Sequence, residues 1–364
     1  MTIDPRARSA LKELERYRPG MSIEEAKRQR RARGPVIKLA SNENALGPSP
    51  RAVAAARRAL GSVHRYPDAL CAKLRFALSA RLKVAPESIL VGNGSDELLV
   101  LALRAFVDPG EDVVVARPTF LIYELQARAA GASVRTVPLN SYRYDLPAMK
   151  AAVTPHTKLV FIANPDNPTG TYVTARELNA FLSGLPGQTL VVMDEAYYEF
   201  VEARDYPQTA RMIGERPVIV TRSFSKAYGL AGLRVGYAIA RPEIIEALDA
   251  VREPFNVNAP AQAAALAALE DRRYLARSRA LLAQGRRYLT AQLDRLRLRH
   301  VPSVTNFILI ELGPRAAGVA AALLARGVIV REMSGWKLDG CIRVTLGTMA
   351  ENRKFIQALQ RCLT

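Results

Sequence analysis

Short apolar runs alternate with amphipathic segments over the first two thirds of the chain. The runs are residues 89–91, 113–116, 133–137, 159–163, 190–193, 218–221 and 235–240. Most of them lack polar positions, which is typical of strands buried on both faces of a parallel sheet. Because helical patterns separate them, we predict an α/β fold whose large domain has a mainly parallel, seven-stranded sheet with helices on both faces.

The pattern changes beyond about residue 241. Residues 243–251 and 260–299 favour helices, and the apolar runs 307–312, 327–332 and 341–346 precede a C-terminal helix that begins near Ala350. These elements predict a second, smaller α+β domain. We therefore expect an N-terminal helix and arm over 1–35 that packs with the small domain, a large domain over 36–255, and an interdomain helix with the small domain over 256–364.

The composition limits the classes of function. The chain has 364 residues and a formal net charge of +18, which raises the alternative of a nucleic-acid-binding protein. The best candidate for a basic surface is KRQRRAR at residues 27–33, but most arginines are spread along helical segments such as 272–299. No aromatic or glycine-rich nucleic-acid motif accompanies them. We therefore expect no nucleic-acid partner, and a basic field that attracts anionic substrates.

Other features argue against a membrane, secreted or metal-binding protein. No apolar run approaches the ~18 residues that span a bilayer, and the first residues lack an apolar secretory core. We therefore expect a cytoplasmic protein without a membrane partner. Histidines and cysteines are few and scattered: His64, His156, His300, Cys71, Cys341 and Cys362. This spacing favours reduced thiols and no metal site.

One lysine, Lys226, has neighbours suited to covalent chemistry. It lies in SFSKAYGLAGLRVGY at residues 223–237, after Ser223 and Ser225 and before Arg234. A lysine amine can form a Schiff base with an aldehyde cofactor, while hydroxyls and a guanidinium can hold a phosphate group. A Ser-x-Ser-Lys sequence is also common on surface loops, so the assignment depends on the segments upstream.

Asp194 directly follows the apolar run 190–193. It is therefore expected beyond the carboxyl end of a buried strand, where open α/β sheets bind ligands. An aspartate there can pair with a protonated pyridine nitrogen, and Tyr197 lies about one helical turn further on. A helix N-cap is the alternative role for Asp194.

Two turns complete the pattern. NPDNPTG at residues 164–170 contains Asn167, although a plain strand-to-helix turn has the same proline and glycine content. GNGSDELL at residues 92–99 predicts a helix that opens at Ser95 and Asp96, whose free backbone amides would bind phosphate. Serine and aspartate are also ordinary helix caps.

The order and spacing of these segments resemble the fold-type-I pyridoxal-phosphate-dependent aminotransferases, and within them the subfamily that acts on histidinol phosphate. The resemblance runs over nearly the whole chain. It rests on YRPG (17–20), IKLASNENALGPSP (37–50), RYPD (65–68), GNGSDELL (92–99), RPTFLIYE (117–124), NPDNPTG (164–170), VVMDEAYYEF (191–200), SFSKAYGLAGLRVGY (223–237), SVTNFILIEL (303–312), RGVIVRE (326–332) and GCIRVTLGT (340–348). Ala45 departs from the proline that the family often has after Glu-Asn in the early loop.

The resemblance implies a role for each matching residue. Lys226 would hold pyridoxal phosphate as a Schiff base and move the substrate proton, while Asp194 would pair with the cofactor's ring nitrogen. Asn167 and Tyr197 would bond the ring's phenolic oxygen, and Phe120 would stack on the ring. The cofactor phosphate would lie among Ser95, Asp96, Ser223, Ser225 and Arg234.

The resemblance also implies substrate and subunit contacts. Arg343 would bind the α-carboxylate of glutamate and, with Arg331 and Tyr17, the phosphate of histidinol phosphate; Asn167 would also contact substrate. An exposed strand-end charge is the alternative for Arg331. Tyr66 in RYPD would reach the cofactor phosphate of a neighbouring subunit, which implies a homodimer with shared active sites.

The implied activity moves an amino group between glutamate/2-oxoglutarate and histidinol phosphate/imidazole-acetol phosphate, in histidine biosynthesis. Trp336, the chain's only tryptophan, lies close in sequence to both substrate arginines. It either lines a pocket that admits aromatic side chains or packs at the surface. The alternative function is therefore an aromatic amino-acid aminotransferase that uses phenylalanine or tyrosine with 2-oxoglutarate and shares the cofactor residues.

Overall fold

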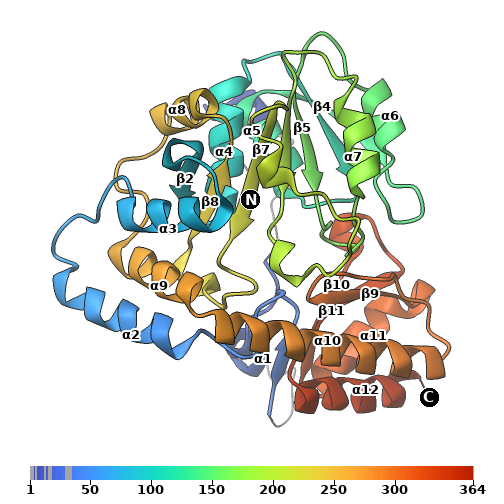
Figure 1. Ribbon diagram of the computed structural model, residues 1–364. Coiled ribbons are helices and arrows are strands. Elements are labelled where there is room, and N and C mark those ends of the chain that lie inside the picture. The colour runs from blue at the N-terminus through green and yellow to red at the C-terminus, as the bar shows by residue number, and fades with distance from the viewer. Residues whose placement is uncertain (1–3, 5, 12–13, 15–18, 29–34, 364) are drawn as a thin grey trace.

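The computed structural model describes the chain except for residues 1–3, 5, 12–13, 15–18, 29–34 and 364. Its larger sheet has seven strands (Figure 1). In spatial order they are β2 (Ile89–Gly92), β8 (Gly236–Ile239), β7 (Val218–Ser223), β6 (Leu190–Asp194), β5 (Thr157–Ala163), β3 (Asp112–Arg117) and β4 (Ser133–Pro138). Neighbours from β7 to β4 pair in parallel, whereas β8 is antiparallel to β7 and β2. The predicted sheet and its strands are confirmed.

Helices cover both faces of this sheet (Figure 1). One face packs against α4 (Ser95–Phe106), α5 (Ile122–Ala130) and α8 (Pro242–Ala250). The other packs against α3 (Ala72–Leu82), α6 (Leu146–Ala151), α7 (Ala175–Leu182) and α9 (Ala259–Glu270). Side chains alternate along a strand, so Val192 on β6 joins the first group and Met193 the second. The central strands β5 and β6 are buried on both faces and are apolar nearly throughout, whereas the edge strand β4 is partly exposed and mixed in sequence.

A smaller sheet has the order β1 (Ile37–Leu39), β10 (Val328–Glu332), β11 (Cys341–Thr345) and β9 (Phe307–Glu311). Helices α11 (Ala316–Ala325) and α12 (Met349–Leu363) accompany it, and Ala26 of α1 (Ile23–Arg28) packs with Ile329. The predicted small α+β unit is confirmed. The division into three domains stays a prediction, and β1, which it assigns to the large domain, instead pairs with β10.

A break separates α9 from α10 (Arg272–Arg295), within the region that the sequence favours as helix. Asp271 lies at the break. Its carboxylate accepts hydrogen bonds from the Tyr274 N–H at 3.1 Å and from the Ser49 hydroxyl at 2.5 Å. Ser49 is itself the N-cap of α2 (Pro50–Ala59). Asp271 thus satisfies a free amide at the start of α10 and ties that start to α2, while α9 and α10 run from the large sheet to the small one (Figure 1).

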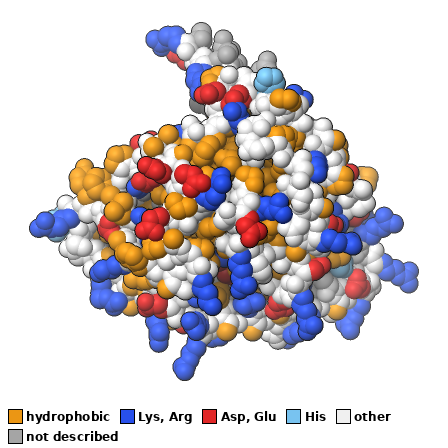
Figure 2. All heavy atoms as spheres, turned by 45° about the horizontal axis from the view of Figure 1, so that its top comes forward, with side chains coloured by type: hydrophobic (Ala, Val, Ile, Leu, Met, Phe, Trp, Pro, Cys, Tyr) orange, Lys and Arg blue, Asp and Glu red, His pale blue; other side chains and the backbone are white. Residues whose placement is uncertain are grey.

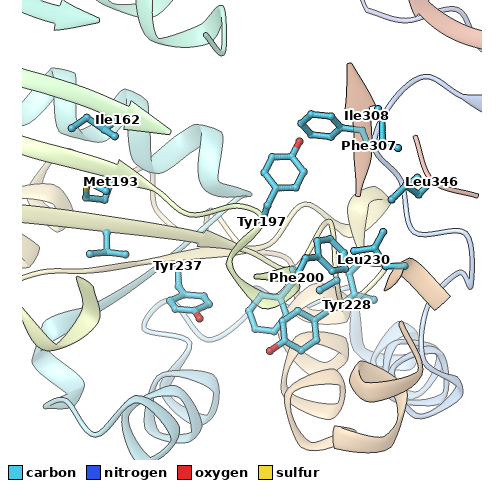
Figure 3. Close-up of a cluster of buried hydrophobic side chains, with 14 of the residues drawn as sticks. Ile162, Met193, Tyr197, Phe200, Tyr228, Leu230, Tyr237, Phe307, Ile308 and Leu346 are labelled. Carbon is cyan, nitrogen blue, oxygen red and sulfur yellow. The ribbon is translucent and has the colours of Figure 1, made fainter. Parts of the chain in front are cut away.

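One apolar core joins the two sheets (Figure 3). Ile162 and Met193 from the large sheet belong to the same buried cluster as Phe307 and Ile308 from β9. Tyr197 comes shortly after β6 in the chain. Its ring packs edge to face against the Phe307 ring, with ring centres 5.4 Å apart. The small sheet is therefore fixed beside the carboxyl ends of the parallel strands.

Candidate active site

A pocket at the carboxyl ends of β5, β6 and β7 gathers most of the residues that the sequence predicted for the site. The predicted residues that line it are Ser95, Asp96, Phe120, Asn167, Asp194, Tyr197, Ser223, Ser225, Lys226, Arg234, Arg331 and Arg343. They meet because parallel strands end at one edge of the sheet and the small sheet closes against that edge.

Lys226 lies half-buried in the loop after β7, with its Nζ 5.7 Å from the centre of the Tyr197 ring. The side-chain amide of Asn44 holds the loop by donating to the Lys226 carbonyl at 3.2 Å and the Ala227 carbonyl at 2.9 Å. Burial, and next the charge of Arg343, lower the pKa of Lys226 to about 8. A neutral amine is thus accessible near neutral pH, as a nucleophile or general base requires.

Asp194, the last residue of β6, is a buried carboxylate with neutral partners. Its Oδ2 accepts a hydrogen bond from the Tyr123 hydroxyl at 2.7 Å. Its Oδ1 accepts from the Ala196 N–H at 3.2 Å and the Thr221 hydroxyl at 3.4 Å. Burial raises the pKa of Asp194 to about 6 against the effect of these bonds. Such a carboxylate gains most from a cationic ligand, for which a protonated ring nitrogen is suited.

The N-terminus of α4 faces the side chain of Arg234. The helix begins without a side-chain cap in the described structure, after Gly94 at a φ of 82°. A Cβ at Gly94 would lie 2.6 Å from Arg234 Nη2, so the close approach requires glycine. Arg234 also donates to Asp96 at 3.3 Å and Ser225 at 3.5 Å. Free amides, a guanidinium and hydroxyls in one cradle suit a phosphate group.

Aromatic and amide groups complete the pocket wall. The Tyr197 hydroxyl accepts a hydrogen bond from the Asn42 side-chain amide at 2.9 Å, and the Asn167 side-chain oxygen accepts one from an arginine of the small sheet. Phe120 lines the pocket and meets the Tyr123 ring edge to face, with centres 5.6 Å apart. Phe120 is therefore part of the wall as well as of the core. The pocket fits a planar, cationic ring that carries a phosphate group.

Arg331 on β10 and Arg343 on β11 lie directly opposite each other, so their side chains leave the sheet on one face. Arg343 is buried and donates to Asn167, and Arg331 is half-buried rather than an exposed strand-end charge. The two guanidinium carbons lie 4.7 Å (Arg331) and 5.7 Å (Arg343) from the Trp336 ring centre. Trp336 is 2% exposed and lines the pocket, so it is not a surface residue.

The pocket carries an excess of positive charge. Its cationic lining residues are Lys226, Arg234, Arg331 and Arg343, and its carboxylates are Asp96 and Asp194. Asp96 is already paired with Arg234. Like charges that face each other across two strands destabilise a sheet unless a ligand of opposite charge lies between them. The site is therefore built for anionic groups.

Two predicted residues lie elsewhere. Tyr66 is 81% exposed, is not part of the pocket wall, and stacks on Phe255 with ring centres 4.5 Å apart. Within one chain it does not reach the site. Tyr17 lies outside the described residues.

The sequence did not predict roles for Asn42, Asn44 and Tyr123, although each contacts a predicted residue. Asn42 donates to Tyr197, Asn44 fixes the backbone at Lys226, and Tyr123 donates to Asp194. All three lie in segments on which the family resemblance rests, residues 37–50 and 117–124, and that was the signal that could have identified them. Nothing in a linear pattern shows which distant partner such a side chain meets.

Other sequence expectations concern the surface and the thiols. Within the described ranges, helices fall short of the length and apolarity needed to cross a bilayer. In the same ranges, no cluster of three or more histidine, cysteine or acidic side chains could hold a metal ion. Cys71, Cys341 and Cys362 are free. Of the basic segment 27–33, only residues 27–28 are described. Figure 2 shows Lys and Arg side chains dispersed over one face among acidic and apolar ones.

The chain matches the family model described as aminotransferase class I and II over residues 34–359. It is 46% identical to a histidinol-phosphate aminotransferase of Moorella thermoacetica, over 99% of this chain and 93% of the relative. A histidinol-phosphate aminotransferase of an Anaeromyxobacter species is 47% identical over 95% of this chain and 96% of the relative. The crystal structure of histidinol-phosphate aminotransferase from Sinorhizobium meliloti in complex with pyridoxal-5'-phosphate superposes with a TM-score of 0.90 at 32% identity, covering 100% of this chain and 98% of that one.

Proposed function

The chain belongs to the aminotransferase class I and II family, whose cofactor is pyridoxal phosphate, and from that premise we propose that it is a histidinol-phosphate transaminase. It would move an amino group between glutamate/2-oxoglutarate and histidinol phosphate/imidazole-acetol phosphate, in histidine biosynthesis. Relatives from Moorella and Anaeromyxobacter bear the name of that activity. The observation that carries the substrate assignment is the opposed pair Arg331 and Arg343 in the pocket of Lys226 and Asp194.

The chemistry of each pocket residue suits a particular part of the cofactor, in agreement with the family resemblance. The cradle at α4 would hold the phosphate through Ser95, Asp96, Ser223, Ser225 and Arg234. Asp194 would face the ring nitrogen, Asn167 and Tyr197 the ring's phenolic oxygen, and Phe120 the ring plane. When bound, the cofactor supplies an aldehyde and an electron-withdrawing ring. Lys226 is the amine that would bind that aldehyde.

Lys226 is also the residue that would move the substrate proton. Once released by an incoming amine, its Nζ would take the proton from the substrate Cα and deliver it to the cofactor's aldehyde carbon in the first half-reaction, and would move a proton in the opposite direction in the second. A pKa of about 8 supports this role, because far more of the amine is neutral near physiological pH than at the ordinary lysine pKa of about 10.4. Ping-pong kinetics are expected, since 2-oxoglutarate leaves before the second substrate binds.

The two arginines would select the substrates. Arg343 would bind the α-carboxylate of glutamate, while Arg331 and Arg343 together would bind the phosphate of histidinol phosphate, as planar guanidiniums do. Arg343 contacts Asn167, which couples the anion site to the cofactor site. Tyr17 stays part of the proposed phosphate site on sequence grounds alone.

We include a homodimer with shared sites in the proposal. The large apolar side chains exposed in the described residues are Leu60, Val63, Tyr66, Leu70, Phe76 and Phe255. They fall within residues 60–76 or, in the case of Phe255, stack on Tyr66. A group of exposed apolar side chains is typical of a protein–protein interface. A partner bound there would allow Tyr66 to reach the partner's cofactor phosphate. We also propose a cytoplasmic location, which the three free cysteines support.

Steady-state kinetics test the substrate assignment. We expect kcat/KM for histidinol phosphate, with 2-oxoglutarate as acceptor, to exceed the values for phenylalanine and tyrosine. Trp336 in the pocket wall is the observation that favours the second candidate, an aromatic amino-acid aminotransferase. A preference for either aromatic acid of more than about tenfold, or ~1.4 kcal/mol of transition-state binding, would favour that candidate instead.

A further inference from the structure

Arg331 and Arg343 lie side by side although their positive charges repel each other. They are direct cross-strand neighbours on one face, where like charges repel. The Trp336 ring lies within cation–π distance of both, 4.7 Å from the Arg331 guanidinium carbon and 5.7 Å from that of Arg343. One aromatic ring therefore offsets part of the repulsion between two guanidiniums.

The segment that carries Trp336 is built to hold the ring in place. The Glu332 carboxylate accepts hydrogen bonds from the Ser334 N–H at 2.8 Å and the Ser334 hydroxyl at 2.5 Å. The backbone N–H of Trp336 donates to the Met333 carbonyl at 2.9 Å. Trp336 also packs in one buried cluster with Leu309 and other apolar residues. The ring is thus a fixed surface against which the longer, more flexible arginines settle.

We propose that Trp336 is a positioning residue that holds Arg331 beside Arg343 and thereby creates the site's preference for a phosphate ester. The inference rests on the proposed function and deepens it. A phosphate dianion uses two guanidiniums at once, whereas a single carboxylate is satisfied by one. Trp336 is nearer to Arg331, and Arg331 is less buried than Arg343, so losing the ring displaces Arg331 more. The carboxylate site at Arg343 is largely retained.

Steady-state kinetics of the holoenzyme test this role with Trp336→Leu and Trp336→Phe. For Trp336→Leu we expect KM for histidinol phosphate to rise on the order of tenfold, with kcat within about twofold of wild type. KM for glutamate should rise much less. Trp336→Phe keeps an aromatic face, so its KM for histidinol phosphate should lie between those of wild type and Trp336→Leu. The matched control is Lys337→Asn, in the same turn, which removes an exposed cation at a φ of 59° that asparagine tolerates.

The phosphate-free analogue histidinol separates positioning from general damage. The proposal is wrong if Trp336→Leu raises KM for histidinol by the same factor as KM for histidinol phosphate. It is also wrong if KM for glutamate rises as much as KM for histidinol phosphate. Unchanged KM values for all three compounds would overturn it as well.

A binding measurement on the wild-type holoenzyme makes the proposal independent of how the variants fold. Trp336 is the only tryptophan, so the protein's tryptophan emission reports on this ring alone. Titration with inorganic phosphate should change the emission saturably, and histidinol phosphate should compete. Emission that phosphate leaves unchanged would contradict the proposal. If the wild type instead prefers aromatic amino acids, the proposed function fails, while the phosphate titration still decides whether Trp336 senses an anion on the two arginines.

Discussion

The Tyr123 hydroxyl donates a 2.7 Å hydrogen bond to Asp194 Oδ2, although 71 residues separate the two in the chain. Tyr123 lies at the start of α5, is 1% exposed, and stacks on Phe161 with ring centres 5.1 Å apart. This bond lowers the pKa of Asp194 while burial raises it. A phenol fixed in the core thus helps to keep charged the carboxylate proposed to face the cofactor ring.

Tyr123→Phe should weaken cofactor binding through Asp194. The change leaves a buried carboxylate oxygen without its shortest donor, which costs about 1–3 kcal/mol. Without that donor the pKa of Asp194 rises further. As the pH is lowered, the variant should therefore lose cofactor affinity at a higher pH than wild type does, because binding needs the ionised carboxylate. The measurement is the cofactor dissociation constant as a function of pH. Tyr172→Phe, which removes a hydrogen bond to exposed Asp205, is the control and should leave the profile unchanged.

Asp194→Asn should stabilise the cofactor-free protein while weakening cofactor binding. Burial raises the pKa of Asp194 from 3.8 to about 6, so the folded state prefers the protonated form. The contribution of this group to the free energy of unfolding is therefore at its maximum below pH 3.8, and it is lost as the pH rises through about 6. Above that pH the buried charge costs on the order of 2–3 kcal/mol. Asparagine carries no such charge.

Urea unfolding of the cofactor-free protein at about pH 5 and about pH 8 checks this expectation. The gain from Asp194→Asn should be larger at the higher pH. A variant that is less stable than wild type at both values would show that the carboxylate contributes to folding rather than to ligand binding.

Replacing Lys226 should abolish turnover whichever residue replaces it. Lys226→Arg keeps the positive charge but cannot supply a neutral amine, and Lys226→Ala removes the group; each should reduce kcat by at least about 10³-fold. Borohydride reduction followed by mass spectrometry should find the cofactor attached to the wild type at Lys226 and to neither variant. In the wild type, the rate of covalent attachment should rise with pH and level off above about 8, where the amine is neutral. Attachment to Lys226→Ala would contradict the assignment.

Disrupting the exposed apolar patch should produce a monomer with little activity. Phe76→Glu places a charge on a side chain that is 62% exposed in the isolated chain and would be buried between subunits. Sedimentation velocity should show the monomer, and turnover should fall with the dimer population. Arg295→Ala, at an exposed residue that ends α10, makes the same change in net charge outside the patch and should leave the dimer intact.

Mixing two inactive variants tests whether Tyr66 serves the partner's site. Hybrid dimers of Lys226→Ala and Tyr66→Ala chains contain one site with both residues intact if Tyr66 acts across the interface. Activity of about a quarter of wild type should then return, because about half of the dimers are hybrids with one good site of two. If the mixture stays as inactive as its parts, Tyr66 does not act across subunits.

Local pattern was sufficient for much of this protein. Apolar runs that end in polar residues predicted the strands and placed Asp194 and Ser223 at one edge, because parallel strands share the position of their carboxyl ends. The serines and glycines around Lys226 and at the start of α4 likewise carry their chemistry in short segments. The sequence also determined which residue types are available to bind an anion.

Partners far apart in the chain were decided only by packing. The contacts of Tyr123 with Asp194 and of Asn42 with Tyr197 depend on how helices and sheets meet, which periodicity does not encode. The pairing of β1 with β10 joins two segments that most of the chain separates, which periodicity does not encode either. Arg331 and Arg343 were predicted from sequence, but their direct opposition and their shared contact with Trp336 follow from strand register. Register depends on the fit of the whole small sheet, so the shape of the anion site exists only in the tertiary structure.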